Sequence, residues 1–166
     1  MKHTIHKFGD NINTDLIIAS RHLTNFLSEE ELGTHVFENL DPNFAKTVRK
    51  GDVPVVGKNF GCGSSREEAV IALAACGLYA IVAESFSRTF FRNCINRGAL
   101  SIVECEGISE ASCDGDEIDL DLSTGTVILS DGTVMHGTVQ PDFVKEIIAD
   151  GGLLEHIAAQ KRKAVE

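Results

Sequence analysis

The residues best suited to chemistry lie in one short segment, residues 57–69, which reads GKNFGCGSSREEA. Gly61 and Gly63 permit positive φ angles and a close approach of a ligand to the backbone. The segment opens a predicted helix, whose first backbone N–H groups have no partner inside the helix and attract an anion. Arg66 adds a fixed positive charge that can grip a carboxylate through two hydrogen bonds. The segment therefore predicts a binding site for a small anion.

Two serines of this segment compete for one structural role. Ser64 and Ser65 each stand three residues before a glutamate, Glu67 and Glu68 respectively, so either serine can cap the helix in a capping box. Only one of them can be the cap, and the other hydroxyl is then free to face a ligand. A purely structural interpretation, in which the serines start a helix and the glycines make a turn, stays open at this point.

Other known site patterns do not match the segment. A phosphate-binding P-loop needs a lysine directly after its last glycine, and Ser64 holds that position here. The nucleophile elbow of hydrolases needs Gly-x-Ser-x-Gly, and no serine of the segment is flanked in this way. Cys62 as a nucleophile needs a histidine base, which no local pattern supplies. Anion binding is the function that the local sequence favours.

The elements around the segment alternate between strand and helix patterns, which is typical of an α/β fold with some parallel strand pairing. Ser28 and Glu31 form a capping box at the start of one helix, and Gly77 and Gly98 are expected to end two others. The predicted helices cover residues 28–40, 65–77 and 87–98. The predicted strands are an alternating run at the start of the chain and residues 16–19, 52–57, 78–86 and 99–104.

The pattern changes after about residue 107. Residues 116–122 alternate in period two, and Asp131-Gly132 stands between two apolar runs, which is a strong hairpin signal. The tail predicts two short helices that are broken at Gly151-Gly152. We expect a single domain over residues 1–166, with a β-rich section at about 107–140 and C-terminal helices at about 141–163.

Composition excludes several classes of partner. The chain has 166 residues with 15 basic and 25 acidic side chains, so its net charge of -10 repels nucleic acid and anionic membrane over most of the surface. No run approaches the roughly 20 apolar residues of a membrane span, and the first ten residues lack the apolar core of a signal peptide. We therefore expect a cytoplasmic protein without nucleic-acid or membrane partners.

The cysteines and histidines give no metal-ligand pattern. The five cysteines are odd in number and contain no Cys-x-x-Cys pair, so the sequence predicts neither a disulfide framework nor a zinc or iron–sulfur site. The histidines show no ligand spacing, and the acidic run at residues 113–121 lacks the twelve-residue calcium loop that ends in glutamate. We expect this chain to bind no metal.

Three sequence blocks together resemble a known family. They are GDNINTDLIIAS at residues 9–20, GKNFGCGSSREEA at 57–69 and ESFSRTFFRNCINRGAL at 84–100. In order and spacing they resemble the blocks of the small subunit of 3-isopropylmalate dehydratase, a swivel-domain member of the aconitase superfamily. The resemblance implies a three-layer β/β/α swivelling domain. It also implies a hydro-lyase that interconverts 2-isopropylmalate and 3-isopropylmalate by dehydration and rehydration, in leucine biosynthesis.

The resemblance implies roles for individual residues. Ser64, the first serine of the Gly-Ser-Ser-Arg block, is the implied base that removes the proton next to a carboxylate. Ser65 and Arg66 are implied to bind the substrate carboxylate, and Asp15 to orient a histidine of another subunit. The remaining implied substrate-binding residues are Cys62, Gly63, Leu23, Thr24 and Asn25.

The resemblance also implies a cofactor and a partner. In aconitase-type enzymes a four-iron, four-sulfur cluster accepts the departing hydroxyl as a Lewis acid. A cluster needs several thiolates brought together, and the cysteines of this chain are separated by 8 to 18 positions without a Cys-x-x-Cys pair. We expect no cofactor on this chain, a cluster on a large-subunit partner, and activity only when the two subunits are combined.

The segment SRHLTNFLSEE, residues 20–30, bears on substrate choice. In the family this loop sets which side group is accepted, and relatives that take an extra carboxylate tend to place an arginine soon after a Tyr-Leu pair. Here His22-Leu23 is followed by Thr24 and Asn25, so an apolar isopropyl group is expected. Dehydratases of citraconate or maleate, 2,3-dimethylmalate or homoaconitate stay open as alternatives, as does an anion-binding module without catalysis.

Overall fold

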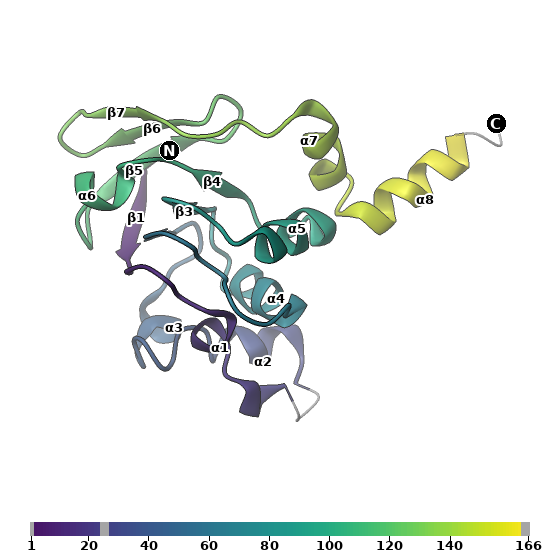
Figure 1. Ribbon diagram of the computed structural model, residues 1–166, viewed down its shortest axis with the longest axis horizontal. Coiled ribbons are helices and arrows are strands. Elements are labelled where there is room, and N and C mark those ends of the chain that lie inside the picture. Colours follow the sequence, from purple (N-terminus) through teal and green to yellow (C-terminus); the bar gives the residue numbers. More distant parts are fainter. Residues whose placement is uncertain (1, 24–26, 164–166) are drawn as a thin grey trace.

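A curled sheet of seven strands organises the computed structural model, which describes residues 2–23 and 27–163 (Figure 1). The strand order in the sheet is β4-β3-β2-β1-β5-β6-β7. Strands β1 to β4 pair in parallel, whereas β5 to β7 continue the sheet in antiparallel pairs that start from β1. The strands are β1 (Lys2–Lys7), β2 (Val53–Val56), β3 (Ile81–Ala83), β4 (Ile102–Glu104), β5 (Glu117–Asp121), β6 (Thr126–Leu129) and β7 (Val134–His136).

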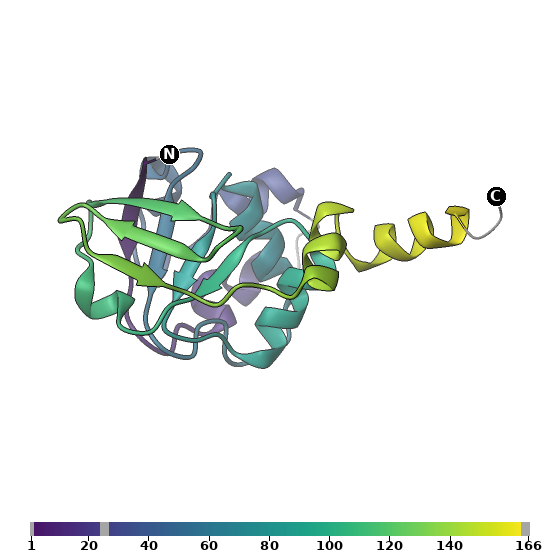
Figure 2. The same cartoon turned by 90° about the horizontal axis from the view of Figure 1, so that it is seen from above.

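The parallel strands form the middle of three layers. Helices α4 (Glu67–Ala75) and α5 (Arg88–Arg97) cover one face, and β5 to β7 fold over the other face (Figures 1 and 2). Alternate residues of one strand accordingly enter different cores: Ile81 packs with the helices, and Val82 packs with the antiparallel strands. All four residues of β2 are buried, as expected for a parallel strand covered on both sides. The predicted β/β/α architecture is confirmed.

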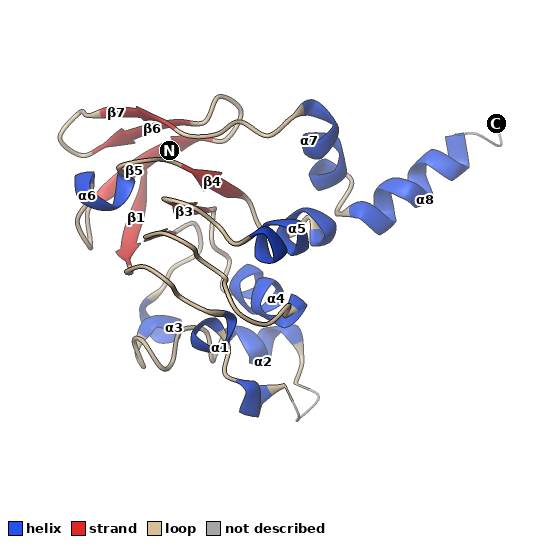
Figure 3. Ribbon diagram, in the orientation of Figure 1, coloured by secondary structure: helices blue, strands red, loops and turns tan. Residues whose placement is uncertain are grey.

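The other helices are short or lie at the C-terminal end. Helices α7 and α8 leave the body beside α5, and α8 extends away from the sheet (Figures 2 and 3). Within residues 2–23 and 27–163, none of the helices has the length and apolar character needed to cross a bilayer. These elements are α1 (Thr14–Ile17), the 3-10 helix η1 (Ser20–His22), α2 (Glu29–Gly33), α3 (Phe44–Thr47), α6 (Ile108–Ala111), α7 (Asp142–Ala149) and α8 (Leu153–Lys163).

Most boundaries set by local rules are confirmed. Gly77 and Gly98 adopt positive φ angles of 71° and 63° directly after α4 and α5, where residues with a Cβ are disfavoured. Gly132 turns the hairpin between β6 and β7. The break between α7 and α8 falls at Gly151-Gly152, as predicted.

The strand expected at residues 16–19 is wrong, because this segment begins in helix α1. The side chain of Asn13 caps the helix by accepting a hydrogen bond from the Leu16 N–H at 2.9 Å. Ile17 and Ile18 are fully buried beneath the helix layer. A short apolar run has the same composition whether it is buried as a strand or as a helical turn, so periodicity did not distinguish them.

The helix expected over residues 28–40 ends at Gly33. Its start is as predicted, since Ser28 and Glu31 form both hydrogen bonds of the capping box. The chain then turns, and Phe37 adopts a φ angle of 56° while its N–H donates to the Ile17 carbonyl at 2.9 Å. This tertiary contact buries Phe37 completely and overrides the helical pattern.

Candidate active site

The site is built where three loops meet at the carboxyl ends of β1, β2 and β3. Parallel strands bring these ends to one edge of the sheet, where α/β proteins place their ligands. The Asn11 N–H donates to the Lys58 carbonyl at 2.8 Å, and the Phe60 N–H donates to the Ser85 carbonyl at 3.0 Å. Backbone hydrogen bonds thus join the middle loop, residues 57–66, to the loops at 8–13 and 84–87.

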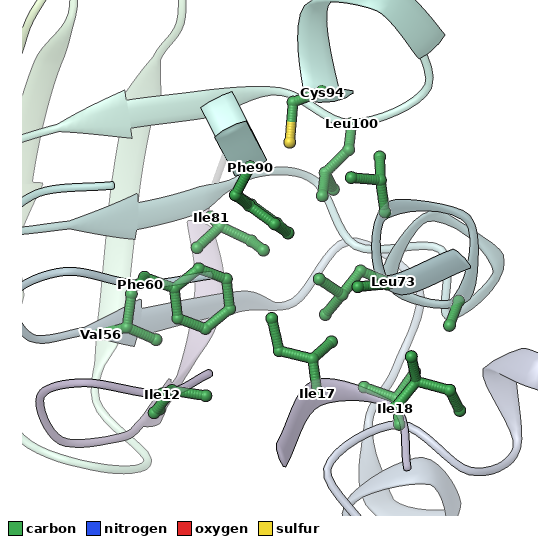
Figure 4. Packing of buried hydrophobic residues seen from close by; sticks show 14 of the residues in the cluster. Ile12, Ile17, Ile18, Val56, Phe60, Leu73, Ile81, Phe90, Cys94 and Leu100 are labelled. Carbon is green, nitrogen blue, oxygen red and sulfur yellow. The ribbon is translucent and has the colours of Figure 1, made fainter. Parts of the chain in front are cut away.

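The middle loop packs closely against a buried cluster of aromatic rings. Gly61 has a φ angle of 75°, and a Cβ added there would lie 2.2 Å from Cγ of Phe90. Phe90 in turn packs edge-on against Phe60, with ring centroids 5.1 Å apart (Figure 4). The hydroxyl of Ser87 donates to the Gly61 carbonyl at 2.7 Å. Only glycine fits at this position. Contact with the ring cluster therefore sets how closely the loop backbone approaches the core.

The residues that follow Cys62, 63–65, are exposed. Thr14 holds the backbone of this stretch by hydrogen bonds. The Thr14 N–H donates to the Cys62 carbonyl at 2.9 Å, and the Thr14 hydroxyl donates to the Ser64 carbonyl at 3.0 Å. Within the part of the chain that the structure describes, the side-chain hydroxyls of Ser64 and Ser65 make no hydrogen bond. The main chain of Ser64 is therefore fixed while its hydroxyl is free to meet a ligand.

The expected serine cap on α4 is wrong. The N-cap residue is Arg66, with φ -117° and ψ 109°, and no side chain caps the helix. Hydrogen bonds from Thr14 to the carbonyls of Cys62 and Ser64 hold this stretch ahead of the first helical turn, which starts at Glu67. Both hydroxyls are consequently free, and the first N–H groups of α4 have no side-chain cap.

Arg66 is oriented by Asp15 from α1. Its Nη1 donates to the Asp15 carboxylate at 2.7 Å and to the Ile18 carbonyl at 3.2 Å. The Ser20 N–H donates to the same Asp15 oxygen at 3.0 Å. The Arg66 hydrogen bond, followed by that from Ser20, lowers the pKa of Asp15, which is therefore ionised at neutral pH.

This pair leaves part of the guanidinium available. The Arg66 side chain is 17% exposed and that of Asp15 is 54% exposed, so the carboxylate holds a largely buried cation. Both hydrogen bonds of Arg66 start from Nη1, whereas a guanidinium has five N–H donors. Among the described residues, its Nη2 and Nε find no acceptor. Arg66 thus combines a fixed position with donors left over for an anion.

Comparisons with known proteins place this chain in a family. The aconitase C-terminal domain model matches residues 26–106. The isopropylmalate/citramalate isomerase small subunit of Methanocaldococcus jannaschii is 44% identical over 167 residues, which cover 100% of this chain and 96% of that protein. The 3-isopropylmalate dehydratase small subunit 1 of Archaeoglobus fulgidus is 47% identical over 159 residues, which cover 95% of this chain and 97% of that protein. The chain belongs to the family of 3-isopropylmalate dehydratase small subunits.

A solved structure agrees with this family assignment. The crystal structure of 3-isopropylmalate dehydratase from Methanocaldococcus jannaschii matches with a TM-score of 0.88 and 39% sequence identity. The match covers 99% of this chain and 95% of that chain. The family and the fold inferred from the three sequence blocks are both confirmed.

The other predicted site residues of this small subunit are only partly brought together. Cys62 and Gly63 lie in the middle loop next to Ser64, and Cys62 is half-buried. Leu23 follows η1 and packs against the hydrophobic core. Thr24 and Asn25 lie outside the described residues.

The cysteines of this small subunit stay apart from one another. Burial raises the pKa of Cys76 to about 11 and also raises that of Cys94, which lies inside α5. Burial, followed by the charge of Glu84, raises the pKa of Cys105. In the described ranges, the single grouping of His, Cys, Asp and Glu side chains close enough to hold a metal contains no cysteine.

Sequence reasoning missed two features of the site region. The first is Thr14, whose hydrogen bonds hold the Ser64 loop although no motif marks a lone threonine in this role. The second is the grouping of His22, His35 and Glu38, which come together across a turn. The i, i+3 spacing of His35 and Glu38 was the one available signal, and it is common on polar surfaces.

Proposed function

We propose that this chain is the small subunit of a 3-isopropylmalate dehydratase, a hydro-lyase of leucine biosynthesis. It interconverts 2-isopropylmalate and 3-isopropylmalate by dehydration and rehydration, and it acts only together with a large subunit. The observation that carries the proposal is the free Ser64 hydroxyl, two residues from an Arg66 guanidinium that Asp15 orients. The relative from Archaeoglobus fulgidus, a 3-isopropylmalate dehydratase small subunit, supports this activity.

Ser64 is the proposed base that removes the carbon-bound proton next to a carboxylate. A serine hydroxyl is a very weak acid in water, so its anion must be stabilised by donors that already point at it. The uncapped first turn of α4 supplies N–H groups and the positive end of the helix dipole. Arg66 supplies a full positive charge two residues away. These groups favour the alkoxide form that the reaction needs.

Arg66 and Ser65 are the proposed carboxylate ligands. The free Nη2 and Nε groups of Arg66 match the fork geometry of a carboxylate, and Ser65 presents a free hydroxyl beside them. Gly63, with a φ angle of 91°, leaves the backbone open to the substrate between these residues. Asp15 acts by holding Arg66 in place, and its proposed hydrogen bond to a histidine of another subunit uses its second oxygen.

The iron–sulfur cluster is proposed to belong to the large subunit. The cysteines of this chain do not fit a cluster, because they are spread over separate elements and three of them have thiol pKa values raised by burial. The proton-abstracting and carboxylate-binding groups are instead concentrated in one exposed loop. An active site completed at the interface of two subunits is the arrangement that this division implies.

Reconstitution tests the proposal. The purified chain is mixed with a cluster-loaded large subunit, and the absorbance of the unsaturated intermediate is followed with 3-isopropylmalate as substrate. We expect Ser64→Ala to lower turnover by about 10²–10⁴-fold, the range of a general base, without changing the free energy of unfolding. Ser130→Ala removes another exposed hydroxyl, from the β6–β7 turn, and is the matched control. Full turnover by the Ser64→Ala enzyme would leave an anion-binding module as the better explanation.

Citramalate is the second candidate substrate. The relative from Methanocaldococcus jannaschii is named an isopropylmalate/citramalate isomerase small subunit and is 44% identical to this chain. Neither substrate has a third carboxylate, in agreement with the lack of an arginine after His22-Leu23. A screen of isopropylmalate, citramalate, dimethylmalate and homoaconitate with the reconstituted enzyme ranks them by kcat/KM. A preference for homoaconitate would contradict the argument from charge.

A further inference from the structure

A second group of polar side chains converges where η1 meets the turn that follows α2. His22 ends η1, whereas His35 and Glu38 lie in the turn that follows α2. His22 Nε2 donates to one oxygen of Glu38 at 2.6 Å, and His35 Nδ1 lies 3.2 Å from the other oxygen. The side chains of His22, His35 and Glu38 are 13%, 35% and 22% exposed, so the group is partly shielded but reachable from solvent.

We propose that His22, His35 and Glu38 form a binding site for one divalent transition-metal ion, and that Zn²⁺ is the ion that fits it best. Each residue offers one ligand atom, and these atoms all lie within 4.8 Å of one another. Two imidazoles and one carboxylate are a ligand set typical of zinc, and they leave a fourth position for water. Hard ions such as Mg²⁺ and Ca²⁺ prefer oxygen ligands and are disfavoured by the two imidazoles.

The separations are close to those of a tetrahedral zinc site. Zinc bonds of about 2.0–2.1 Å place neighbouring ligand atoms about 3.3 Å apart in a tetrahedron. The two imidazole-to-carboxylate separations, 2.6 and 3.2 Å, are both shorter than this value. Zinc entry therefore requires shifts on the order of 1 Å rather than a refolded loop.

The rings must also rotate. The imidazoles of His22 and His35 are stacked, with centroids 3.7 Å apart and planes 13° from parallel. Coordination needs a deprotonated nitrogen of each ring to point at the same ion. His35 is the more exposed ring and has the room to turn about its side-chain bonds. Glu38, which contacts both rings, would then share the ion with them.

Charge in the cluster also suits a cation. The two carboxylate oxygens of Glu38 face the two imidazoles, one oxygen toward each ring. Arg21 also contacts the carboxylate and competes with a metal ion, although its side chain is 61% exposed and can move into solvent. Replacing Arg21 should thus tighten zinc binding, by up to about five-fold, the effect of an exposed ion pair.

Zinc would join two segments that are separated along the chain. His22 and the pair His35 and Glu38 lie at the two ends of residues 23–34, so the ion would close this stretch into a loop. Because zinc binds the folded chain at this point, it should raise the melting temperature on the order of 5–10 °C at a hundred-fold excess over Kd. Because its ligands must be deprotonated, binding should weaken as the pH falls.

Calorimetric titration of the full chain with Zn²⁺, thiols reduced, tests the site. We expect one equivalent to bind to the wild type and at least a hundred-fold loss of affinity in His22→Gln/His35→Gln. That variant keeps every cysteine and so measures the thiol background. His136→Gln alters an exposed histidine of β7 and is the matched control, with unchanged affinity. Equal zinc affinity of the wild type and the double variant would overturn the proposal.

A spectroscopic measurement on the unaltered protein keeps the test independent of variant folding. Imidazole ¹⁵N resonances are recorded while one equivalent of Zn²⁺ is added. We expect the two resonance sets assigned to His22 and His35 to shift together, while His136 and His156 stay in place. Arg21→Gln should reach saturation at lower zinc concentration. Shifts at His136 or His156 without shifts at His22 and His35 would refute the site.

Discussion

Replacement of Gly61 by alanine tests whether contact with the ring cluster sets the position of the middle loop against the core. The new Cβ would lie 2.2, 2.4 and 2.6 Å from three atoms of Phe90, where carbon atoms normally pack at about 3.5–4.0 Å. Phe90 is 1% exposed and packs on Phe60, so its ring cannot move aside to make room for the new Cβ. Overpacking of this kind costs about 1–3 kcal/mol. The positive φ angle adds about 1–2 kcal/mol, so we expect a total of about 2–5 kcal/mol.

Gly115 offers a matched control for the backbone contribution. Its φ angle is 81°, and an added Cβ would meet no atom within 4 Å. Gly115→Ala should therefore lose only about 1–2 kcal/mol, the cost of the left-handed backbone. Urea unfolding of both variants at 25 °C measures the difference, with an unchanged m value as the check that the denatured states are alike. An equal loss of unfolding free energy in the two variants would contradict this account, because the contact with Phe90 would then contribute nothing.

Three further predictions follow from the site region. Ser87→Ala removes the cap of α5 and a hydrogen bond to the middle loop, so urea unfolding should show a loss of about 1–2 kcal/mol. Because the pKa of Asp15 is lower in the folded protein than in the unfolded chain, its ionised carboxylate stabilises the fold at pH values above the ordinary pKa. This stabilisation is lost as the pH falls through the lower pKa of the folded state. Asp15→Asn should hence flatten the loss of stability that occurs as the pH falls below about 4, as thermal unfolding at a series of acidic pH values would show. With a thiol reagent at neutral pH, Cys113, which is exposed, should react in the folded protein, whereas buried Cys94 should react only after unfolding, as peptide mapping would show.

The elements that sequence reasoning placed well are those fixed by neighbouring residues. The capping box of Ser28 and Glu31 lies within four residues, and the glycine at the end of α5 acts on the turn directly before it. The hairpin at Asp131-Gly132 is similarly local. In each case the deciding hydrogen bond or φ angle belongs to residues that are adjacent in sequence. Local chemistry is then sufficient to predict the structure.

The misplaced elements were decided by contacts between distant residues. Phe37 ends the helical path after Gly33 because its N–H bonds to Ile17, twenty positions earlier. The run at residues 16–19 begins inside helix α1, whose cap residue, Asn13, is also held by a backbone bridge to Cys62, 49 positions later. These partners are not visible in a window of neighbouring residues. A pattern of apolar residues predicts burial in such segments, but it does not predict the backbone that achieves the burial.

The candidate site shows the same division. Its residue types were visible in the Gly-Ser-Ser-Arg block, and the family resemblance suggested their roles. The pairing of Arg66 with Asp15 joins residues 51 positions apart, and the grouping of His22 with Glu38 crosses a turn that was not predicted. Single-sequence reasoning therefore identified the chemical groups and missed which of them hold one another.

The failed serine cap explains why the hydroxyl of Ser64 is free. A serine that capped α4 would accept a backbone N–H at the helix start, and its oxygen would be occupied by the fold. Thr14 prevents this by holding the Ser64 carbonyl, which keeps the serine ahead of the helix while leaving its side chain unbonded. The helix start thus lacks a cap that would stabilise it by about 1 kcal/mol. A local rule broken at such a cost is expected where a side chain serves a ligand, and the N–H groups that no serine satisfies are then free to stabilise the developing charge.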